Sequence, residues 1–184
     1  MSTFKLIGLG GLAGSGKTTI AKNLWRVAAE EQVTGIVLSF ATPLKRMLVE
    51  MLRADGWTED QITQQMQVGK NEPIPQYGGQ SLRYMMQTLG TEWGRNTIQA
   101  SFWADMGERT MKRSRAGLVV FDDLRFATES AMIKRNGGMV VQLERAGTQR
   151  LNHASEGMEY TADKVWQNDG DPLDLARKIW ADVQ

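Results

Sequence analysis

The sequence predicts an α/β fold in which helices cover both faces of a central parallel sheet, giving three layers in a single domain over residues 1–184. Short apolar runs alternate with segments in which apolar residues recur at helical spacing, the pattern of consecutive β-α-β units. A glycine-rich loop, Gly11 to Thr18, separates the first apolar run from the first helical pattern. These two observations together favour an α/β sheet that opens with a strand, a loop and a helix.

The N-terminal elements are the most clearly marked. Residues 4–9 form a short apolar run and predict a buried strand. Beyond the loop, Ile20, Leu24 and Val27 recur at helical spacing and predict the first helix. The loop between them reads GLAGSGKT and fits G-x-x-x-x-G-K-[ST], the P-loop pattern. The predicted architecture is therefore the P-loop NTPase fold.

The P-loop pattern carries a definite chemistry. Its glycines let consecutive backbone N–H groups turn inward around a polyphosphate, and the helix N-terminus adds partial positive charge. In such loops the lysine, here Lys17, reaches the β- and γ-phosphates, while the hydroxyl of Thr18 binds Mg²⁺. We therefore expect ATP and Mg²⁺ as cofactors. The residues predicted to bind ATP in this loop are Gly11, Ala13, Gly14, Ser15, Gly16, Lys17, Thr18 and Thr19.

An insertion is expected between the second and third strands. Residues 35–40 predict the second strand, after which Thr42 is expected to cap a helix with Pro43 at its first position. The alternation then breaks, since a loop rich in proline and glycine precedes two further helical patterns. We expect these residues, about 43–115, to form a helical insertion rather than an independent domain.

The alternation resumes towards the C-terminus. The remaining predicted elements are a strand over 118–121, a helix from about Thr128 to Asn136, strands over 139–143 and 164–167, and a last helix capped by Asp171.

Composition excludes several classes of protein. A formal net charge of +1 offers no general case for nucleic-acid binding, and no apolar run approaches the roughly 20 residues that cross a bilayer. The chain has no cysteine and a single histidine, His153, so disulfides, thiolate metal sites and Ser-His or Cys-His catalysis are not expected. We expect a cytoplasmic protein without nucleic-acid or membrane partners; a homodimer is possible but has no residue-level support.

Two carboxylates follow the third predicted strand directly. Asp122 and Asp123 come after a buried run, at the edge of a parallel sheet where ligands bind, and Arg125 lies two residues on. A carboxylate there can hold the Mg²⁺ shell or orient a phosphate-binding arginine, whereas the alternative is an ordinary solvated loop. We assign Asp123 to the metal and to catalysis, with Asp122 left open as the alternative ligand.

Four sequence blocks, in order, resemble the deoxynucleoside monophosphate kinases encoded by tailed bacteriophages. The first is the P-loop. The second, LRYMMQTLGTEWGR over 82–95, is similar to an R-x-x-x-Q-x-x-G-T segment of that family. The third, VVFDDLRF over 119–126, matches an apolar run followed by D-x-R, and the fourth comprises HASE over 153–156 with NDG over 168–170. Together the blocks span most of the chain.

The resemblance implies roles for residues in the insertion. Arg83 and Arg95 would hold the monophosphate substrate, and Gln87, one helical turn beyond Arg83, could hydrogen-bond the edge of the base. Arg125 would contact the same substrate. Trp93 would either stack on the base or pack within the insertion. The alternative for the arginines is ordinary solvated surface charge, the usual environment of arginine.

The resemblance also implies roles after the fourth predicted strand. Residues 145–157 would form a small lid in which Arg145 neutralises the transferring phosphoryl group; an ordinary exposed loop is the alternative. The role of His153 stays open. Asn168 and Gly170 could place backbone groups around the adenine of ATP, or could simply form the turn before the last helix.

The function implied is transfer of the γ-phosphoryl of ATP to a deoxynucleoside monophosphate, giving ADP and the diphosphate. Two alternatives remain at this point: another small-molecule P-loop kinase, acting on a coenzyme precursor or a sugar acid, and an ATP-binding switch or accessory protein. Which bases are accepted, and whether deoxyribose is preferred over ribose, does not follow from the sequence.

Overall fold

The computed structural model describes residues 4–148 and 159–184. The chain divides into two compact units. The first, which we call the sheet unit, comprises Met1–Phe40 and Ala104–Gln184, and the second, the helical unit, comprises Ala41–Trp103. The helical unit is thus an insertion, and its extent differs from the range of about 43–115 expected from the sequence.

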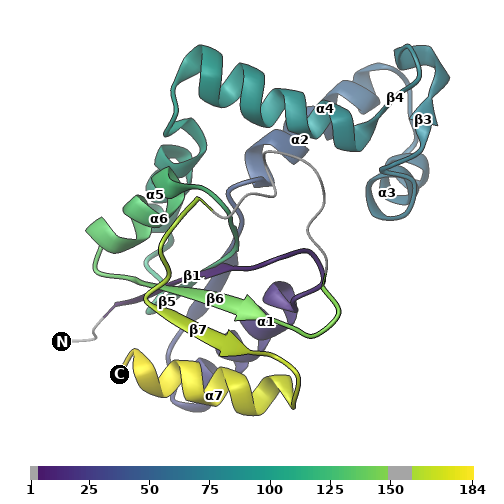
Figure 1. The fold of residues 1–184 in the computed structure, drawn as a ribbon. Coiled ribbons are helices and arrows are strands. Elements are labelled where there is room, and N and C mark those ends of the chain that lie inside the picture. Colours follow the sequence, from purple (N-terminus) through teal and green to yellow (C-terminus); the bar gives the residue numbers. More distant parts are fainter. Residues whose placement is uncertain (1–3, 149–158) are drawn as a thin grey trace. The chain divides into compact units, whose positions relative to one another are not determined.

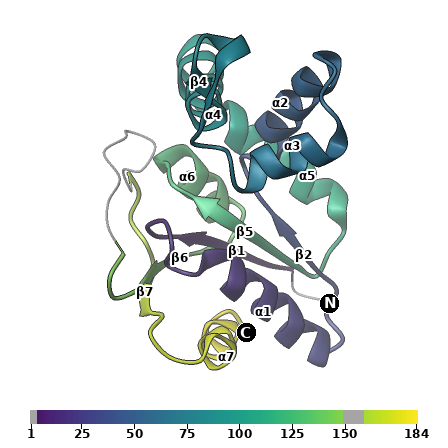
Figure 2. The ribbon, with the colours of Figure 1, turned by 90° about the vertical axis from the view of Figure 1, so that its right-hand side faces the viewer.

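The sheet unit contains a five-stranded sheet in which every paired strand is parallel (Figures 1 and 2). The strands lie in the order β2-β5-β1-β6-β7. Their bounds are β1 (Lys5–Gly10), β2 (Gly35–Leu38), β5 (Leu118–Leu124), β6 (Met139–Glu144) and β7 (Lys164–Gln167). From β1 the chain moves to β2 at one edge of the sheet, whereas from β5 it moves in the opposite direction, across β1, to β6. In parallel sheets, ligands bind at the point where the direction of the connections reverses in this way.

Helices cover both faces of this sheet, as Figure 1 shows. On one face lie α1 (Lys17–Glu30) and α7 (Pro172–Asp182); on the other lies α6 (Ala127–Arg135), with the part of α5 (Phe102–Ser114) that belongs to this unit. Successive residues of β5 serve both cores. Leu118 and Val120 pack in the α1/α7 layer, whereas Val119 and Phe121 pack in the α5/α6 layer. A run buried on both sides is apolar throughout, which is why this strand is plain in the sequence.

The helical unit has a smaller core of its own. Its elements are α2 (Thr42–Ala54), α3 (Glu59–Gln67), β3 (Pro73–Ile74), η1 (Pro75–Tyr77), β4 (Gln80–Ser81), α4 (Leu82–Thr88), the π-helix η2 (Leu89–Ile98) and the first residues of α5. Four fully buried side chains, one each from α2, α3, β3 and α4, form the centre: Leu52, Ile62, Ile74 and Leu82.

The predicted three-layer α/β fold with a parallel sheet is confirmed, and several local predictions are corrected. Thr42 is not the N-cap but the first residue of α2. The N-cap position is taken by Ala41, and no side chain caps the helix. Helix α3 was missed, although Thr58 and Gln61 form a complete capping box at its start. In the described part of the chain no helix has the length and apolarity needed to span a membrane.

Candidate active site

The P-loop connects the carboxyl end of β1 to the first turn of α1. Helix α1 has no side-chain cap and no acidic residue in its first turn, so its first backbone N–H groups are left for an anion. Gly16 precedes the helix at φ 90°, a left-handed conformation that glycine adopts without strain. This geometry is that of a phosphate-binding loop.

Lys17 lies across the loop itself. Its Nζ donates to the carbonyl oxygens of Gly11, at 2.7 Å, and Leu12, at 2.8 Å, and lies 3.5 Å from the hydroxyl of Ser15. Ser15 is fully buried. The ammonium group is therefore held within the concave side of the loop, where the phosphates of a bound nucleotide would lie.

Asn168, in the loop between β7 and α7, supports the P-loop. Its side-chain amide is buried and donates to the carbonyl oxygen of Ser15 at 2.8 Å, while its backbone N–H donates to Glu144 at 2.7 Å. A Cβ at Gly16 would come within 2.3 Å of the Asn168 amide nitrogen, so the contact also requires glycine there. The side chain of Asn168 thus braces the loop, a role that the sequence did not suggest.

Asp122 and Asp123 lie near the carboxyl end of β5, which extends to Leu124 and not only to Phe121 as predicted. This end of the strand lies beside β1, and the two aspartates have different partners. Thr18 donates its hydroxyl to Asp122 Oδ2 at 2.8 Å. Asp123 instead accepts from the Ser39 hydroxyl at 2.5 Å and from the backbone N–H of Phe40 at 2.8 Å. The assignment of the metal to Asp123 is therefore not what this geometry favours, because the carboxylate that meets the P-loop hydroxyl is that of Asp122.

The donor set around Thr18 suits magnesium. A hydroxyl and a carboxylate oxygen are hard ligands, and Mg²⁺ in kinases commonly binds one or two protein oxygens, with phosphates and waters completing its shell. Among the described residues there is no cluster of three or more His, Cys, Asp or Glu side chains that could hold a metal without a nucleotide. Thr18 and Asp122 therefore fit Mg²⁺ as two of its oxygen ligands.

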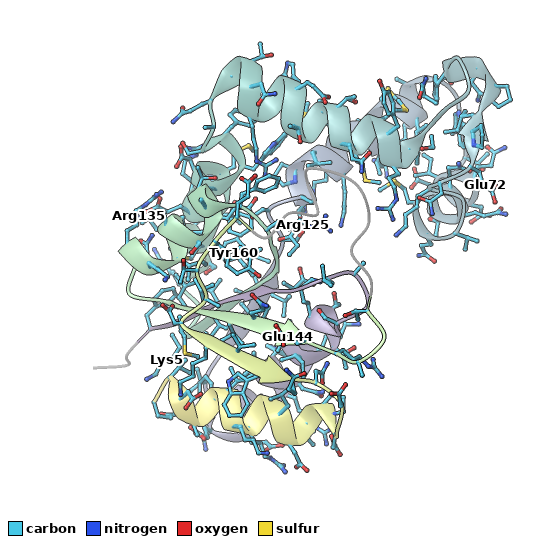
Figure 3. All side chains as sticks on the ribbon, in the orientation of Figure 1. Lys5, Glu72, Arg125, Arg135, Glu144 and Tyr160 are labelled. Carbon is cyan, nitrogen blue, oxygen red and sulfur yellow. The ribbon has the colours of Figure 1, made fainter. Side chains whose placement is uncertain are left out.

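The segment after β5 is organised by a buried carboxylate. Glu129, 2% exposed, accepts from the backbone N–H groups of Arg125, at 2.8 Å, and Phe126, at 3.1 Å. The carbonyl of Arg125 accepts from Glu159 N at 3.3 Å, and Tyr160 follows on this adjoining segment (Figure 3). Burial raises the pKa of Tyr160 to about 12. Arg125 therefore lies in a loop whose backbone is held by Glu129. Sequence reasoning missed this role, because Glu129 stands out only as a glutamate in the first turn of a helix.

The region expected to form a lid is described only in part. Arg145 is exposed at the end of β6, in a turn where its carbonyl accepts from the Thr148 hydroxyl at 2.9 Å. The turn is tied to the loop before α7, because Ala146 N donates to Asp169 at 2.9 Å. Gly170 is exposed in that loop. His153 and the rest of the predicted lid lie outside the described residues.

In the helical unit, α4 carries two of the predicted substrate residues. Arg83 and Gln87 are four residues apart on this helix and so share one face. The Arg83 guanidinium donates to Asn71 Oδ1 at 2.5 Å, and its backbone N–H donates to the carbonyl of Lys70 at 2.8 Å. The loop before β3 therefore sets the position of Arg83 on its helix.

The π-helix η2 carries the other two. Arg95 donates to the carbonyl of Gly90 at 2.9 Å, an acceptor that it shares with the buried indole N–H of Trp103 at 2.8 Å. Trp93 is 39% exposed and packs edge-to-face on Phe102, with ring centroids 5.6 Å apart. Trp103 belongs to the core, whereas Trp93 offers part of its ring to solvent. Long π-helices are rare and often occur at functional sites.

Solved structures of kinases are among those that match this fold. A mutant of the APS kinase of Mycobacterium tuberculosis matches with a TM-score of 0.51 and 15% identity over 98% of this chain and 96% of that one. The shikimate kinase of Aquifex aeolicus matches with a TM-score of 0.46 and 12% identity over 96% and 94% of the two chains. At this level of identity, the likeness to the APS kinase shows a shared P-loop kinase fold and no more.

The sequence comparisons are more specific. The family model for deoxynucleotide monophosphate kinase matches residues 54–179. A protein of Acanthamoeba polyphaga mimivirus, provisionally named a deoxynucleotide monophosphate kinase, is 33% identical over 156 residues, which cover 77% of this chain and 75% of the viral protein. The matched range takes in the helical unit from Ala54 onwards, β5 and the loop containing Asn168. The chain therefore belongs to the deoxynucleotide monophosphate kinase family and is a phosphotransferase.

Proposed function

We propose that this kinase transfers the γ-phosphoryl group of ATP to the phosphate of a deoxynucleoside monophosphate, with donor and acceptor held by residues of different units. The observation that carries the proposal is the pairing of Thr18 with Asp122 beside a P-loop that encloses Lys17, in a chain of this family. These groups are the ones that a triphosphate with its metal requires.

The reaction needs no general base. An oxygen of the acceptor phosphate forms a bond to the γ-phosphorus, the bond from that phosphorus to the β–γ bridging oxygen breaks, and ADP leaves. The second pKa of a phosphate monoester is about 6, so the nucleophile is largely ionised at neutral pH. Catalysis then depends on positioning and on neutralising charge, which agrees with a chain that contains a single histidine.

The donor site lies in the sheet unit. The P-loop N–H groups from Gly11 to Thr19 would cradle the phosphates, and Lys17 would leave its carbonyl partners for the β- and γ-oxygens. Thr18 and Asp122 would hold Mg²⁺, which offsets the negative charge that develops on these oxygens. Asn168 would act through the P-loop that it braces, and Gly170 stays a candidate for contact with the adenine.

The acceptor site lies in the helical unit. Arg83 and Arg95 would hold the acceptor phosphate, since a guanidinium presents a planar set of donors that matches phosphate oxygens. Gln87, on the same face as Arg83, would meet the base edge, and the exposed ring of Trp93 would lie against the base. Arg125 and Arg145, from the sheet unit, would neutralise the transferring group. A transition-state arginine can contribute on the order of 10³-fold in rate.

A substrate panel tests this function. ADP and the phosphorylated product would be measured by chromatography with each of the four deoxynucleoside monophosphates, the ribonucleotides, shikimate and adenosine phosphosulfate as acceptors. We expect stoichiometric ADP and deoxynucleoside diphosphate with at least one deoxynucleotide. Turnover only with shikimate or adenosine phosphosulfate would support a different small-molecule kinase, and ADP formation without any acceptor product would support a switch or accessory ATPase.

A further inference from the structure

We propose that Asp123 is a positioning residue that fixes the point at which the chain leaves the sheet unit, while the adjacent Asp122 serves the nucleotide. The role concerns the same reaction and therefore rests on the proposed function. It assigns the two carboxylates near the carboxyl end of β5 to different tasks, and it reverses the sequence-based assignment of the metal to Asp123.

The first observation is that both oxygens of Asp123 bind the residues that follow β2. Oδ2 accepts from the Ser39 hydroxyl at 2.5 Å, and Oδ1 accepts from the backbone N–H of Phe40 at 2.8 Å. Strand β2 pairs with β5 up to Leu38, so these bonds continue the attachment for two residues beyond the ladder. Hydrogen bonds to an ionised carboxylate are about twice as strong as neutral ones.

The second observation is that Phe40 is held by its ring as well as by its backbone. It is 2% exposed and stacks on Phe121, with ring centroids 4.2 Å apart and an angle of 13° between the planes. A Cβ at Gly107 of α5 would lie 2.9 Å from the Phe40 ring, so the ring packs directly against that helix backbone. Phe40 is the last residue of the sheet unit before the helical unit begins at Ala41.

The two aspartates are separated by the geometry of the strand. Successive side chains of a strand point to opposite faces, which lets Asp122 meet Thr18 while Asp123 meets Ser39. The dipeptide Asp122-Asp123 is therefore hydrogen-bonded both to Thr18 and to the two residues that precede the helical unit, Ser39 and Phe40. Because the acceptor residues Arg83 and Arg95 belong to that unit, loss of Asp123 would loosen the start of the segment that carries them. Misplacement by about 1 Å can cost on the order of 10²-fold in rate.

Variants at the two aspartates separate positioning from metal binding. In Asp123→Asn the amide oxygen can still accept from Phe40 N–H and its nitrogen can donate to the Ser39 oxygen, so we expect kcat within about threefold of wild type. Asp123→Ala loses both bonds, and kcat should fall by about 10- to 100-fold. Ser39→Ala should cause a smaller loss, and adding it to Asp123→Ala should have little further effect. In all of these variants the Mg²⁺ concentration for half-maximal activity stays at the wild-type value.

Asp122→Asn is the matched control. It should raise the Mg²⁺ requirement, because an amide oxygen is a weaker ligand for Mg²⁺ than a carboxylate. A comparable rise in Asp123→Asn, with no effect of Ser39→Ala, would overturn the proposal and return Asp123 to the metal.

Hydrogen exchange in the ligand-free protein tests the structural half of the inference independently of catalysis. Backbone amides over residues 38–42 should exchange faster in Asp123→Ala than in wild type, and should be unchanged in Asp122→Asn. Unchanged exchange at Phe40 in Asp123→Ala would refute the positioning role even if turnover were altered. Absence of deoxynucleotide turnover in the wild-type protein would instead refute the proposed function. The exchange result would still decide whether Asp123 holds Ser39 and Phe40 in place.

Discussion

The sheet unit and the helical unit differ in how firmly they are built. In the sheet unit, two clusters of fully buried side chains pack on opposite faces of five paired strands. The helical unit has one cluster of four buried side chains, and Leu44, Leu48 and Trp103 are the other buried large apolar side chains among its described residues. Stability is rarely uniform across a structure, and weakly packed regions open more readily. The difference suggests a rigid donor site and an acceptor site that can adjust to its ligand.

The two units also differ in how readily their residues could be assigned from the sequence. The P-loop, the strands of the five-stranded sheet and the last helix were predictable from local signals, such as the apolar run of β5 and the Pro that follows Asp171. The short strands β3 and β4 were not predicted, because their proline- and glycine-rich segment is typical of a loop. Helix α3 was missed because Ile62 is its only buried residue. The π-helix has no sequence pattern distinct from that of an α-helix, so its arrangement of Trp93 and Arg95 could not be foreseen.

Within the site, the sequence allowed us to predict which residues take part better than which groups they bond. The P-loop could be assigned residue by residue because the motif itself encodes the geometry. The distinct partners of Asp122 and Asp123, by contrast, depend on strand pairing between β1, β5 and β2, which brings together residues about a hundred positions apart. The contact of Asn168 with Ser15 joins residues at opposite ends of the chain, so the sequence offered for Asn168 only contact with adenine or a simple turn.

The largest expected effect is a loss of kcat when the P-loop lysine of the sheet unit is removed. Lys17→Ala should reduce kcat by about 10³-fold or more, because a charge that stabilises the transferring group is removed. Its melting temperature should stay close to that of wild type, since Lys17 is not part of the clusters of buried apolar side chains that form the cores. Steady-state kinetics and thermal denaturation measure the two quantities, and wild-type turnover in this variant would remove the P-loop from the mechanism.

Core truncations compare the two units directly. Leu24→Ala, between the sheet and α7, should destabilise the protein by about 3–5 kcal/mol, whereas Ile62→Ala in the helical unit should cost about 2–3 kcal/mol. Because the helical unit has the smaller core, Ile62→Ala should also increase amide exchange over residues 41–103 selectively. Equal losses with uniform exchange would mean that the two units unfold as one.

A substitution at the acceptor site should act on one substrate only. Arg83→Ala should raise the KM for the deoxynucleoside monophosphate by about 10- to 100-fold and leave the KM for ATP within twofold, as expected for loss of a charge-assisted contact with phosphate. Arg53→Ala is the matched control in the same unit, because Arg53 is exposed and paired with Glu50 and Glu59. Equal changes in both KM values would contradict the assignment of Arg83.

The smallest effect concerns acid stability in the sheet unit. Arg135 of α6, together with Lys112 and Asn136, lowers the pKa of Glu108 from 4.5 to about 2, and Asp105 bonds the same arginine. A lowered carboxyl pKa stabilises the fold above the unfolded value and loses this contribution as the pH falls from about 4.5 towards 2. Because Arg135 is partly exposed, we expect about 1 kcal/mol.

Glu108→Gln measures that contribution. Urea denaturation at pH 7 should give a lower free energy of unfolding for the variant than for wild type, and the difference should disappear near pH 2. A difference that stays constant down to pH 2 would assign the effect of the substitution to packing rather than to the charge of Glu108.

The central claim is that the donor site lies in one unit and the acceptor site in the other. Calorimetric titration tests it most directly, with an ATP analogue and a deoxynucleoside monophosphate each titrated into Lys17→Ala and into Arg83→Ala. We expect Lys17→Ala to lose affinity for a non-hydrolysable ATP analogue with Mg²⁺ and to keep that for the deoxynucleoside monophosphate. Arg83→Ala should show the opposite pattern. If both variants lost both ligands to the same degree, or if Arg83→Ala weakened only the ATP analogue, the division of roles would be contradicted.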